Sequence, residues 1–498
     1  MVTERASVTA MNSISPTRYR IRLTDFLITL ISVSASIVFL LVNDKDYCNS
    51  MVILPVLFGL CYIVFAAPLI HVKRSKTLLI FTVCEFLRCV FLPVFVAFSE
   101  YSGFYAYSTD DKELILDAVL LMSWEMIVLF VFLYIYVRNQ DLRVEEKREV
   151  KLDEKKYAIY LLIIIGIVIY FAVPSLRYYI SFFAINADTD KVRDINAGGM
   201  STIFTGLMNY VHIAFLCIFI LILDSWSNRF DAFRKQRYIW GCLVIGLLTI
   251  AVIFGESRAA IVYTLFAVLM CMHLKYPEFK KRINAILVIG AVAVLLGMTI
   301  YRLFAVYNYG SYSDALTSGR SLRANYFSDF FEAYLLGPQA MASGIEFKER
   351  FAGSFGLERL LYDLFRPFMG FNLLLQRGNV ETSITTYNSW LTGIAGRSNG
   401  YFLQITAQGY CYFGFFFAPV FAGLFMWLSL IIEKWMNKTK NLFVFFFLNY
   451  VFIRTSTCVL GGPMSGYITS TTMTLLVCGA FYLMQKVIVF RRKGIDSK

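Results

Sequence analysis

Arginine is distributed unevenly along this chain of 498 residues. In the connections that the hydropathy pattern assigns to one side of a membrane, twelve arginines accompany four lysines, whereas the other side has fourteen arginines and sixteen lysines. A guanidinium is always charged, and its planar fork binds a phosphate or carboxylate through two hydrogen bonds. Arginine on the less basic side therefore indicates anion binding there. The candidates are Arg177, Arg193, Arg258, Arg302, Arg320, Arg323, Arg350, Arg359, Arg366, Arg377 and Arg397.

A structural role for the same arginines stays open, because acids lie close to them in sequence. The longest connection holds eight carboxylates that could bind guanidinium groups in ion pairs. They are Asp314, Asp329, Glu332, Glu346, Glu349, Glu358, Asp363 and Glu381.

Arg258 has the most constrained setting of these arginines. The run Phe254-Gly-Glu-Ser-Arg-Ala-Ala-Ile261 links two apolar segments through a short turn that contains one acid and one base. Such a link would hold Arg258 at the level of the lipid headgroups, where a pyrophosphate would lie. An interfacial anchor is the alternative.

The apolar segments contain further polar residues, among them His212, three charges at matching depths, and Arg454 near the outer end of the run 441–460. His212 lies about a third of the way down its span, so it could face an outward cavity or be a buried, hydrogen-bonded residue. Glu85 and Arg88 share a helix face, and Glu125 reaches a matching depth in the next span. We expect these three charges to neutralise one another, with a proton or ion pathway as the alternative.

Apolar runs long enough to cross a bilayer must position these residues. They predict an all-α, polytopic integral membrane protein of about twelve transmembrane helices. The runs fall near 23–42, 51–70, 77–98, 114–137, 157–173, 203–223, 238–254, 259–274, 283–301, 413–432, 441–460 and 466–489.

Lysine and arginine follow every second span, which sets the orientation. Basic groups precede the first span and follow the even-numbered ones, for example Lys73 to Lys76, Arg138 to Lys156 and Arg491 to Lys493. The positive-inside rule then places both termini in the cytoplasm of a multi-pass protein. The residues before the first span are polar, so no cleavable signal peptide is expected.

One outer connection is far longer than the others and is expected to contain short interfacial helices. Its apolar stretches 326–336 and 360–366 are broken by Gly337-Pro338 and Arg366-Pro367. The expected organisation is a cytoplasmic tail 1–22, nine spans over 23–301, a large extracytoplasmic loop 302–412, three spans over 413–489 and a cytoplasmic tail 490–498.

Composition excludes several other classes of protein. Hydrophobic residues make up 58% of the chain and charged residues only 16%, so a soluble multidomain protein is excluded. The net charge of +13 arises from basic residues at span ends, which argues against a nucleic-acid partner. The ten cysteines lack paired CxxC spacing and mostly lie in spans, so they predict neither disulfides nor a metal site.

Two local patterns resemble those of a known family. Gly255-Glu-Ser-Arg-Ala-Ala260 resembles the Ser-Arg-small-small start of a span in the bacterial Wzy-type O-antigen and capsule polymerases and the related O-antigen ligases. The stretch 397–404, Arg-Ser-Asn-Gly-Tyr-Phe-Leu-Gln, followed by Gly409-Tyr-Cys-Tyr-Phe-Gly414, resembles the segment that enters the span after their large loop. The ligases usually have histidine where Ser398 stands, which favours the polymerases.

The resemblance implies that the protein polymerises undecaprenyl-pyrophosphate-linked oligosaccharide units on the outer face of the bacterial cytoplasmic membrane, without cofactor or metal. For the leaving pyrophosphate the candidates are Arg258 with Arg302 or Arg323, and for the base they are Glu332, Asp329 or His212. Substrate contacts would come from Arg193, Arg320, Arg397, Asn399 and Tyr401. Chain-length regulator and flippase proteins would be its partners, together with membrane lipid. Gly409 and Gly414 would permit close helix packing.

Three other activities stay open at this point. A flippase for lipid-linked oligosaccharides, or another multi-span transporter, would share the span number and the cytoplasmic termini, although carriers commonly have matched halves. A glycosyltransferase that uses a polyprenyl-phosphate sugar would place Asp44 or Asp46 as the catalytic acid. An O-antigen ligase is the third.

Overall fold

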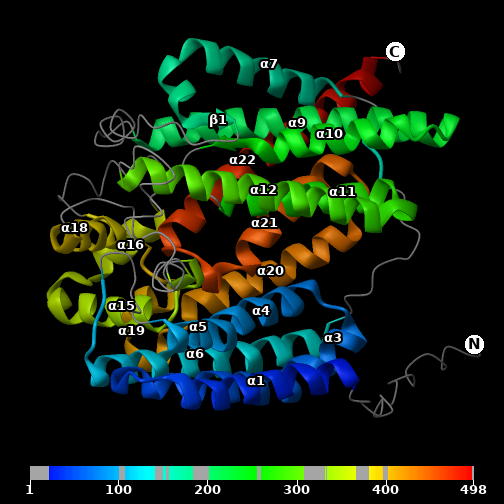
Figure 1. Cartoon of the computed structure of the whole chain (residues 1–498). Coiled ribbons are helices and arrows are strands. Elements are labelled where there is room, and N and C mark those ends of the chain that lie inside the picture. Colours follow the sequence, from blue (N-terminus) through cyan, green and yellow to red (C-terminus); the bar gives the residue numbers. More distant parts are fainter. Residues whose placement is uncertain are drawn as a thin grey trace, which may run out of the picture.

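The computed structural model describes residues 22–99, 107–140, 150–152, 156–182, 201–254, 259–307, 331–332, 334–365, 381–395 and 402–495. The helices run side by side in one bundle, and consecutive long helices alternate in direction (Figure 1). The first helix begins and the last one ends at the same end of this bundle (Figure 1). The prediction of an all-α architecture is therefore confirmed, apart from one short pair of strands.

The helices form two groups, each with its own buried apolar core. The first group surrounds Phe58, Phe81 and Phe130, whose rings pack edge to face. It comprises α1 (Leu23–Val42), α2 (Ile53–Cys61), α3 (Ala67–Lys73), α4 (Lys76–Phe86), α5 (Leu92–Phe98), α6 (Lys112–Arg138), α15 (Pro338–Arg350), α18 (Ser383–Ala395), α19 (Ile405–Phe417) and α20 (Val420–Lys438).

The second group has a core around Phe219 and Phe446, whose ring centroids are 5.9 Å apart. A two-stranded antiparallel sheet joins two of its connections and pairs β1 (Ile180–Phe182) with β2 (Val252–Phe254). The group comprises α7 (Tyr157–Ala172), α9 (Ser201–Phe233), α10 (Arg237–Ala251), α11 (Ala259–Lys275), α12 (Lys280–Tyr307), α21 (Leu442–Ser456) and α22 (Met464–Ile495).

Two of the long helices contain a π-helical turn, and in each case a proline follows it. Residues 62–66 link α2 to α3, in which Pro68 lies in the first turn, and residues 87–91 link α4 to α5, in which Pro93 does. Proline lacks the amide hydrogen that would continue the helical hydrogen bonding, so the turn before it widens. The second of these turns carries Arg88.

The outer surface of the bundle is apolar, as a lipid environment requires. Leu41, Phe171 and Phe416 are exposed by 80%, 63% and 72%. Seven described helices are long and apolar enough to cross a membrane, and four shorter ones are also apolar. A polytopic membrane protein is therefore supported, and the number of twelve spans stays a prediction.

The segment predicted as the tenth span differs from the structure. The sequence predicts one helix over 413–432, but α19 ends at Phe417 and α20 runs from Val420 to Lys438. Gly414 has a φ of 75°, which interrupts the helix, and Pro419 caps the start of α20. Continuous hydropathy across these residues concealed the break.

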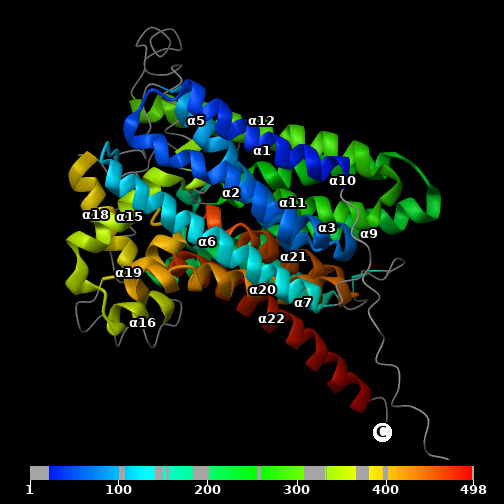
Figure 2. The same ribbon diagram turned by 90° about the horizontal axis from the view of Figure 1, so that it is seen from below.

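Helices of the predicted outer loop gather at one end of the bundle, which we call the loop end. They are α15, α16 (Leu357–Phe365), α18 and α19 (Figures 1 and 2). α16 coincides with the predicted apolar stretch 360–366, whereas much of 326–336 lies outside the described residues. α15 is more deeply buried than an interfacial helix, because it packs against both α6 and α19.

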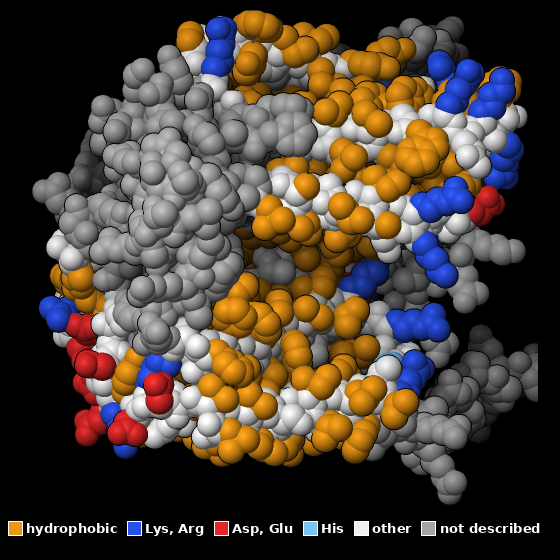
Figure 3. Space-filling view, in the orientation of Figure 1, with side chains coloured by type: hydrophobic (Ala, Val, Ile, Leu, Met, Phe, Trp, Pro, Cys, Tyr) orange, Lys and Arg blue, Asp and Glu red, His pale blue; other side chains and the backbone are white. Residues whose placement is uncertain are grey.

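The opposite end carries most of the described lysines and arginines, and we call it the basic end (Figure 3). Two buried acids join helices there. The Glu433 carboxylate accepts hydrogen bonds from the hydroxyl of Thr77, at 2.7 Å, and from its amide, at 3.1 Å, and so caps α4. Asp224 lies 2.9 Å from the Lys156 ammonium and 3.4 Å from that of Lys275. The charges of Glu433 and Asp224 therefore hold neighbouring helices together at the basic end.

Candidate functional site

Most of the residues nominated from the sequence lie outside the part of the chain that the structure describes. Side chains are described for Glu332 and His212, and Arg302 lies in the stretch of α12 for which only the backbone is described. Arg258, Arg323 and Asp329 from the catalytic set lie outside the described residues, as do Arg193, Arg320, Arg397, Asn399 and Tyr401 from the binding set.

The described arginines of the loop end have structural partners. Arg350 forms an ion pair with Glu346 one turn away in α15 and lies over the ring of Trp390. Arg359 donates hydrogen bonds to the hydroxyls of Ser354, at 2.8 Å, and Thr386, at 3.2 Å. Arg350 therefore forms the ion pair that the structural alternative predicts, whereas Arg359 is held by hydroxyl groups instead.

Glu332 also has a structural task. One of its carboxylate oxygens accepts hydrogen bonds from the amides of Gln339, at 2.6 Å, and Ala340, at 3.2 Å. It thereby satisfies free amides in the first turn of α15, and its side chain is fully buried. A side chain at Gly337 would meet the other carboxylate oxygen at 2.7 Å, so glycine lets Glu332 approach the turn closely. We therefore assign Glu332 to holding the loop rather than to proton transfer.

The three charges of the first helix group form one buried cluster, as the sequence predicts. The Arg88 Nη1 atom lies 2.8 Å from the Glu125 carboxylate and 3.7 Å from that of Glu85. The Arg88 Nε–H donates to the carbonyl oxygen of Leu336, at 2.9 Å, just before α15. Thr406 at the start of α19 donates to Glu125, at 2.6 Å. The Arg88 guanidinium thus faces both carboxylates, and the cluster fixes two segments of the predicted loop against α4 and α6.

Asp363 is a second buried acid at the loop end. Its carboxylate accepts hydrogen bonds from Ser383 in α18, and from Gln408 and Tyr412 in α19, both at 2.8 Å. Burial raises the pKa of Asp363, while the hydrogen bonds from Ser383 and Tyr412 act in the opposite direction. Asp363 therefore joins α16, α18 and α19, and it has no exposed surface for a substrate.

His212 belongs to a polar and aromatic group between four helices of the second group. Its ring centroid lies 5.8 Å from that of Tyr450 in α21, and Tyr450 is 6.1 Å from Tyr263 in α11. The guanidinium carbon of Arg454 lies 5.2 Å from the Tyr263 ring centroid. Tyr467 of α22 is close enough to Tyr263 and Arg454 to interact with both electrostatically. We call these five residues the Arg454 cluster.

The Arg454 cluster lies toward the loop end. Tyr263 is near the start of α11, whose first residue, Ala259, directly follows Arg258 in sequence. Arg454 is in the last turn of α21, and α22 begins at Met464, whose amide donates to the Gln408 side chain of α19 at 2.8 Å. The cluster is therefore near the outer level at which the sequence places its arginine candidates.

Arg454 differs from the other described arginines of the loop end in its surroundings. Its side chain is partly buried, and among the residues that the structure describes no carboxylate lies within 4 Å of its guanidinium. Arg359 shares these two properties, but its guanidinium donates hydrogen bonds to two hydroxyl groups, whereas that of Arg454 donates none to a described residue. Its described contact is the face of the Tyr263 ring, and its charge acts on the nearby side chains of His212 and Tyr450. A half-buried cation without an acid can bind an anion that arrives with a substrate.

Arg454 lies near the outer end of the predicted span 441–460 and is not among the residues nominated from the sequence. A charged residue in an apolar segment with no acid in that segment signals a function by itself. The run Phe445-Phe-Phe-Leu-Asn-Tyr-Val-Phe-Ile-Arg454 contains no carboxylate, so this signal was present.

The surface between the two helix groups is hollowed. Figure 3 shows this hollow on the face that it presents, bordered by hydrophobic side chains of both groups. Tyr467 of the Arg454 cluster packs on Phe425 of α20, with 5.4 Å between ring centroids, so the cluster adjoins the boundary of the two groups.

The described residues contain no group of three or more histidine, cysteine or acidic side chains arranged to hold a metal ion. All ten cysteines are free and buried. Comparisons of the chain with protein-family models, with curated proteins and with solved structures find no match. The functional argument therefore depends on the chain's own residues.

Proposed function

We propose that this protein is a glycosyltransferase of the bacterial cytoplasmic membrane that polymerises undecaprenyl-pyrophosphate-linked oligosaccharide units on the outer face, for a surface polysaccharide. The observation that carries the proposal is Arg454, a half-buried guanidinium with no carboxylate within 4 Å among the described residues, at the loop end of an apolar bundle. The resemblance of 255–260 and 397–414 to the Wzy-type polymerases supports the same activity.

In the proposed reaction, a hydroxyl oxygen of the acceptor unit bonds to the anomeric carbon of the donor chain. The bond from that carbon to the pyrophosphate breaks, and its electron pair leaves with the pyrophosphate. A guanidinium stabilises the negative charge that develops on the leaving oxygen, and a half-buried setting strengthens that interaction relative to water. Arg454 takes this role, with Arg258 and Arg302 as the neighbouring candidates from the sequence.

The hydroxyl proton requires an acceptor. His212 is the nominated base whose side chain the structure describes, and it lies in the Arg454 cluster. Burial and the nearby guanidinium both oppose a second positive charge there, so His212 would hold the proton only while the anionic leaving group is present. Its side chain is 8% exposed, so a substrate would reach it only from inside the cluster. Asp329 is the remaining carboxylate candidate from the sequence.

The substrates proposed here are lipids, so they would approach from the bilayer. The hollow between the helix groups suits a polyprenyl chain, because hydrophobic side chains border it (Figure 3). The hollow and the Arg454 cluster adjoin the same boundary, which would keep the pyrophosphate at one end of the lipid path.

Loss of the gene in its host tests this proposal. The surface glycan should then be limited to one repeat unit per chain, while lipid-linked units still appear on the outer leaflet. A strain with unchanged glycan length would contradict the proposal. Inner-leaflet accumulation of the units would instead identify a flippase, for which the hollow between two helix groups is the favouring observation.

A further inference from the structure

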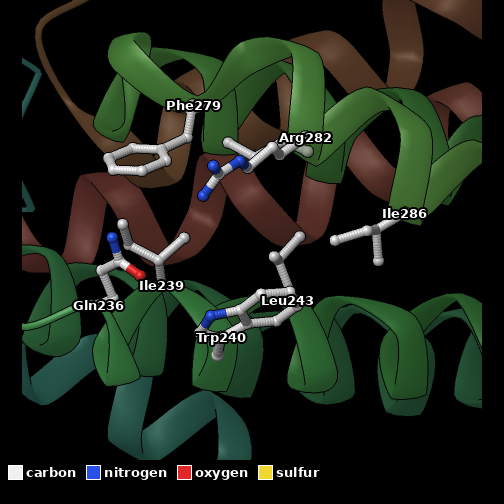
Figure 4. A pocket seen from close by; sticks show the side chains of 8 residues that line it. Gln236, Ile239, Trp240, Leu243, Phe279, Arg282 and Ile286 are labelled. Atoms are coloured by element: carbon white, nitrogen blue, oxygen red, sulfur yellow. The ribbon is translucent and has the colours of Figure 1, made fainter.

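A groove opens between α10 and α12 at the basic end, away from the Arg454 cluster (Figure 4). It is lined by Gln236, Ile239, Trp240, Leu243, Phe279, Arg282, Ile283 and Ile286. Figure 4 shows the Arg282 guanidinium directed into the space between the two helices. The groove thus combines an apolar floor with one cation.

Helix packing explains why the groove lies at this level. Toward the loop end, α12 presents Gly290 to Leu247 of α10 so closely that a side chain at 290 would collide with the leucine. Toward the basic end, the bulky side chains of Trp240 and Phe279 line the space between the helices instead. Close approach at Gly290 and bulk at the basic end therefore leave an open groove rather than a filled interface.

The charges around the groove favour an anion. Arg282, Lys280 and Lys281 are exposed, and Arg237 precedes the groove on α10. Among the described residues, no carboxylate lies within 4 Å of any of these four cations. Glu278, next to Phe279 in sequence, is paired with Arg234 at 3.6 Å. This end of α10 and α12 therefore has a local excess of positive charge.

The groove also continues along an apolar surface that faces outward. Trp240 is 52% exposed, and Val244 and Ile289, further along the same two helices, are 53% and 69% exposed. Tryptophan at this position is typical of the headgroup level of a membrane, and the aliphatic residues beyond it suit an acyl chain. A soluble anion such as phosphate has no apolar part that could bind to this surface.

We propose that this groove binds an anionic phospholipid of the leaflet at the basic end. The lipid phosphate would accept hydrogen bonds from Arg282, and one acyl chain would lie along Trp240 and Ile289. Basic grooves between membrane helices are suited to such headgroups because phosphate and guanidinium match in both charge and geometry. The proposal is independent of the reaction at the Arg454 cluster.

Native mass spectrometry of the purified full-length protein tests the site. The probes are phosphatidylglycerol and phosphatidylcholine with identical acyl chains, added to detergent-solubilised protein. We expect phosphatidylglycerol to bind more tightly, and Arg282→Gln to weaken it about tenfold, because a hydrogen bond to a charged group is lost. Trp240→Ala should weaken both lipids, since it removes the apolar contact.

Lys438→Gln is the matched control, because Lys438 is an exposed cation at the basic end on α20, in the other helix group. Its loss should leave phosphatidylglycerol binding nearly unchanged. Equal binding of the two lipids, or equal effects of Arg282→Gln and Lys438→Gln, would overturn the proposal. Displacement of phosphatidylglycerol by an equal concentration of inorganic phosphate would also overturn it, because the site would then bind free phosphate.

Discussion

The guanidinium carbon of Arg454 lies 5.2 Å from the ring centroid of Tyr263, and these two residues come from α21 and α11. The contact fixes a cation inside an aromatic group without neutralising it. Among the described residues, the remaining arginines of the loop end contact acids, hydroxyls or the rings of their own segments. Arg454 is therefore the described guanidinium that is best placed to receive a pyrophosphate.

We predict that Arg454→Lys lowers the rate of glycan polymerisation by about a hundredfold, the effect of removing one donor that stabilises transition-state charge. Lysine keeps the charge but loses the planar fork that binds two oxygens. Repeat-unit number per chain, measured on the surface glycan of the complemented deletion strain, reports the effect.

Arg350→Lys serves as the control for Arg454, because Arg350 already pairs with Glu346 at the loop end. Its glycan should keep the normal length, and both variants should reach the membrane in normal amounts. Normal glycan length with Arg454→Lys would remove Arg454 from the site.

The buried pair Arg88–Glu125 predicts a non-additive effect on stability. Arg88→Met should lower the free energy of unfolding by about 3–5 kcal/mol, since it leaves the buried carboxylates of Glu85 and Glu125 without a cation. Glu125→Leu should cost less, because Glu85 still lies 3.7 Å from Arg88. The double variant should lose less than the sum of the two, because the Arg88–Glu125 pair can be broken only once. Thermal unfolding in detergent measures all three, and additive losses would show that the two residues are not coupled.

Burial of Asp363 predicts a pH-dependent stability. In the folded protein the pKa of Asp363 is raised above its ordinary value of 3.8. At a pH between the ordinary and the raised pKa, the folded state therefore holds more protons than the unfolded chain. The free energy of unfolding should therefore fall as pH rises from about 4 through the raised pKa, and then level off. Asp363→Asn should flatten that part of the profile, as followed by thermal unfolding.

Glu358→Gln is the matched control for Asp363, because Glu358 is an exposed acid of the same helix, α16. Its profile should follow that of the unmodified protein. An identical slope in Asp363→Asn would show that another group causes the pH dependence.

Two glycines at the turn between α19 and α20 predict losses of different size. A side chain at Gly409 would collide with the backbone of Ala418, so Gly409→Ala should cost about 1–3 kcal/mol or more. Gly414 has open space around it and a φ of 75°, so Gly414→Ala should cost about 1 kcal/mol of backbone strain.

Gly393→Ala provides the reference for both glycines, since Gly393 lies in α18 and a methyl group added there would meet no other atom within 4 Å. It should not lower the midpoint of thermal unfolding. Equal midpoints for Gly409→Ala and Gly393→Ala would contradict the close approach to Ala418.

The sequence predicted the long helices well because lipid requires continuous apolar segments with charge at their ends. It also predicted that Glu85, Arg88 and Glu125 lie together, because isolated charges are costly in an apolar bundle. α15 was missed, since its sequence Pro-Gln-Ala-Met-Ala-Ser-Gly-Ile-Glu-Phe-Lys-Glu-Arg lacks an apolar run. Its burial comes from contacts with α6 and α19, which local sequence does not encode.

The candidate site was predicted less well than the fold. His212 was nominated, but its neighbours Tyr263 and Tyr450 come from helices far apart in sequence. Glu332 looked like a base because it is an acid in a long loop, yet its oxygen is taken by the amides of α15. Which acids are free for chemistry depends on tertiary contacts, and spacing along the chain does not reveal them.

Reconstitution tests the central claim most directly. The purified protein in liposomes would receive undecaprenyl-pyrophosphate-linked repeat units, and mass spectrometry would count the repeats on each lipid. We predict chains of two or more repeats on one lipid, with release of one undecaprenyl pyrophosphate for each bond formed. Units that remain single, with no pyrophosphate lipid released, would contradict the account.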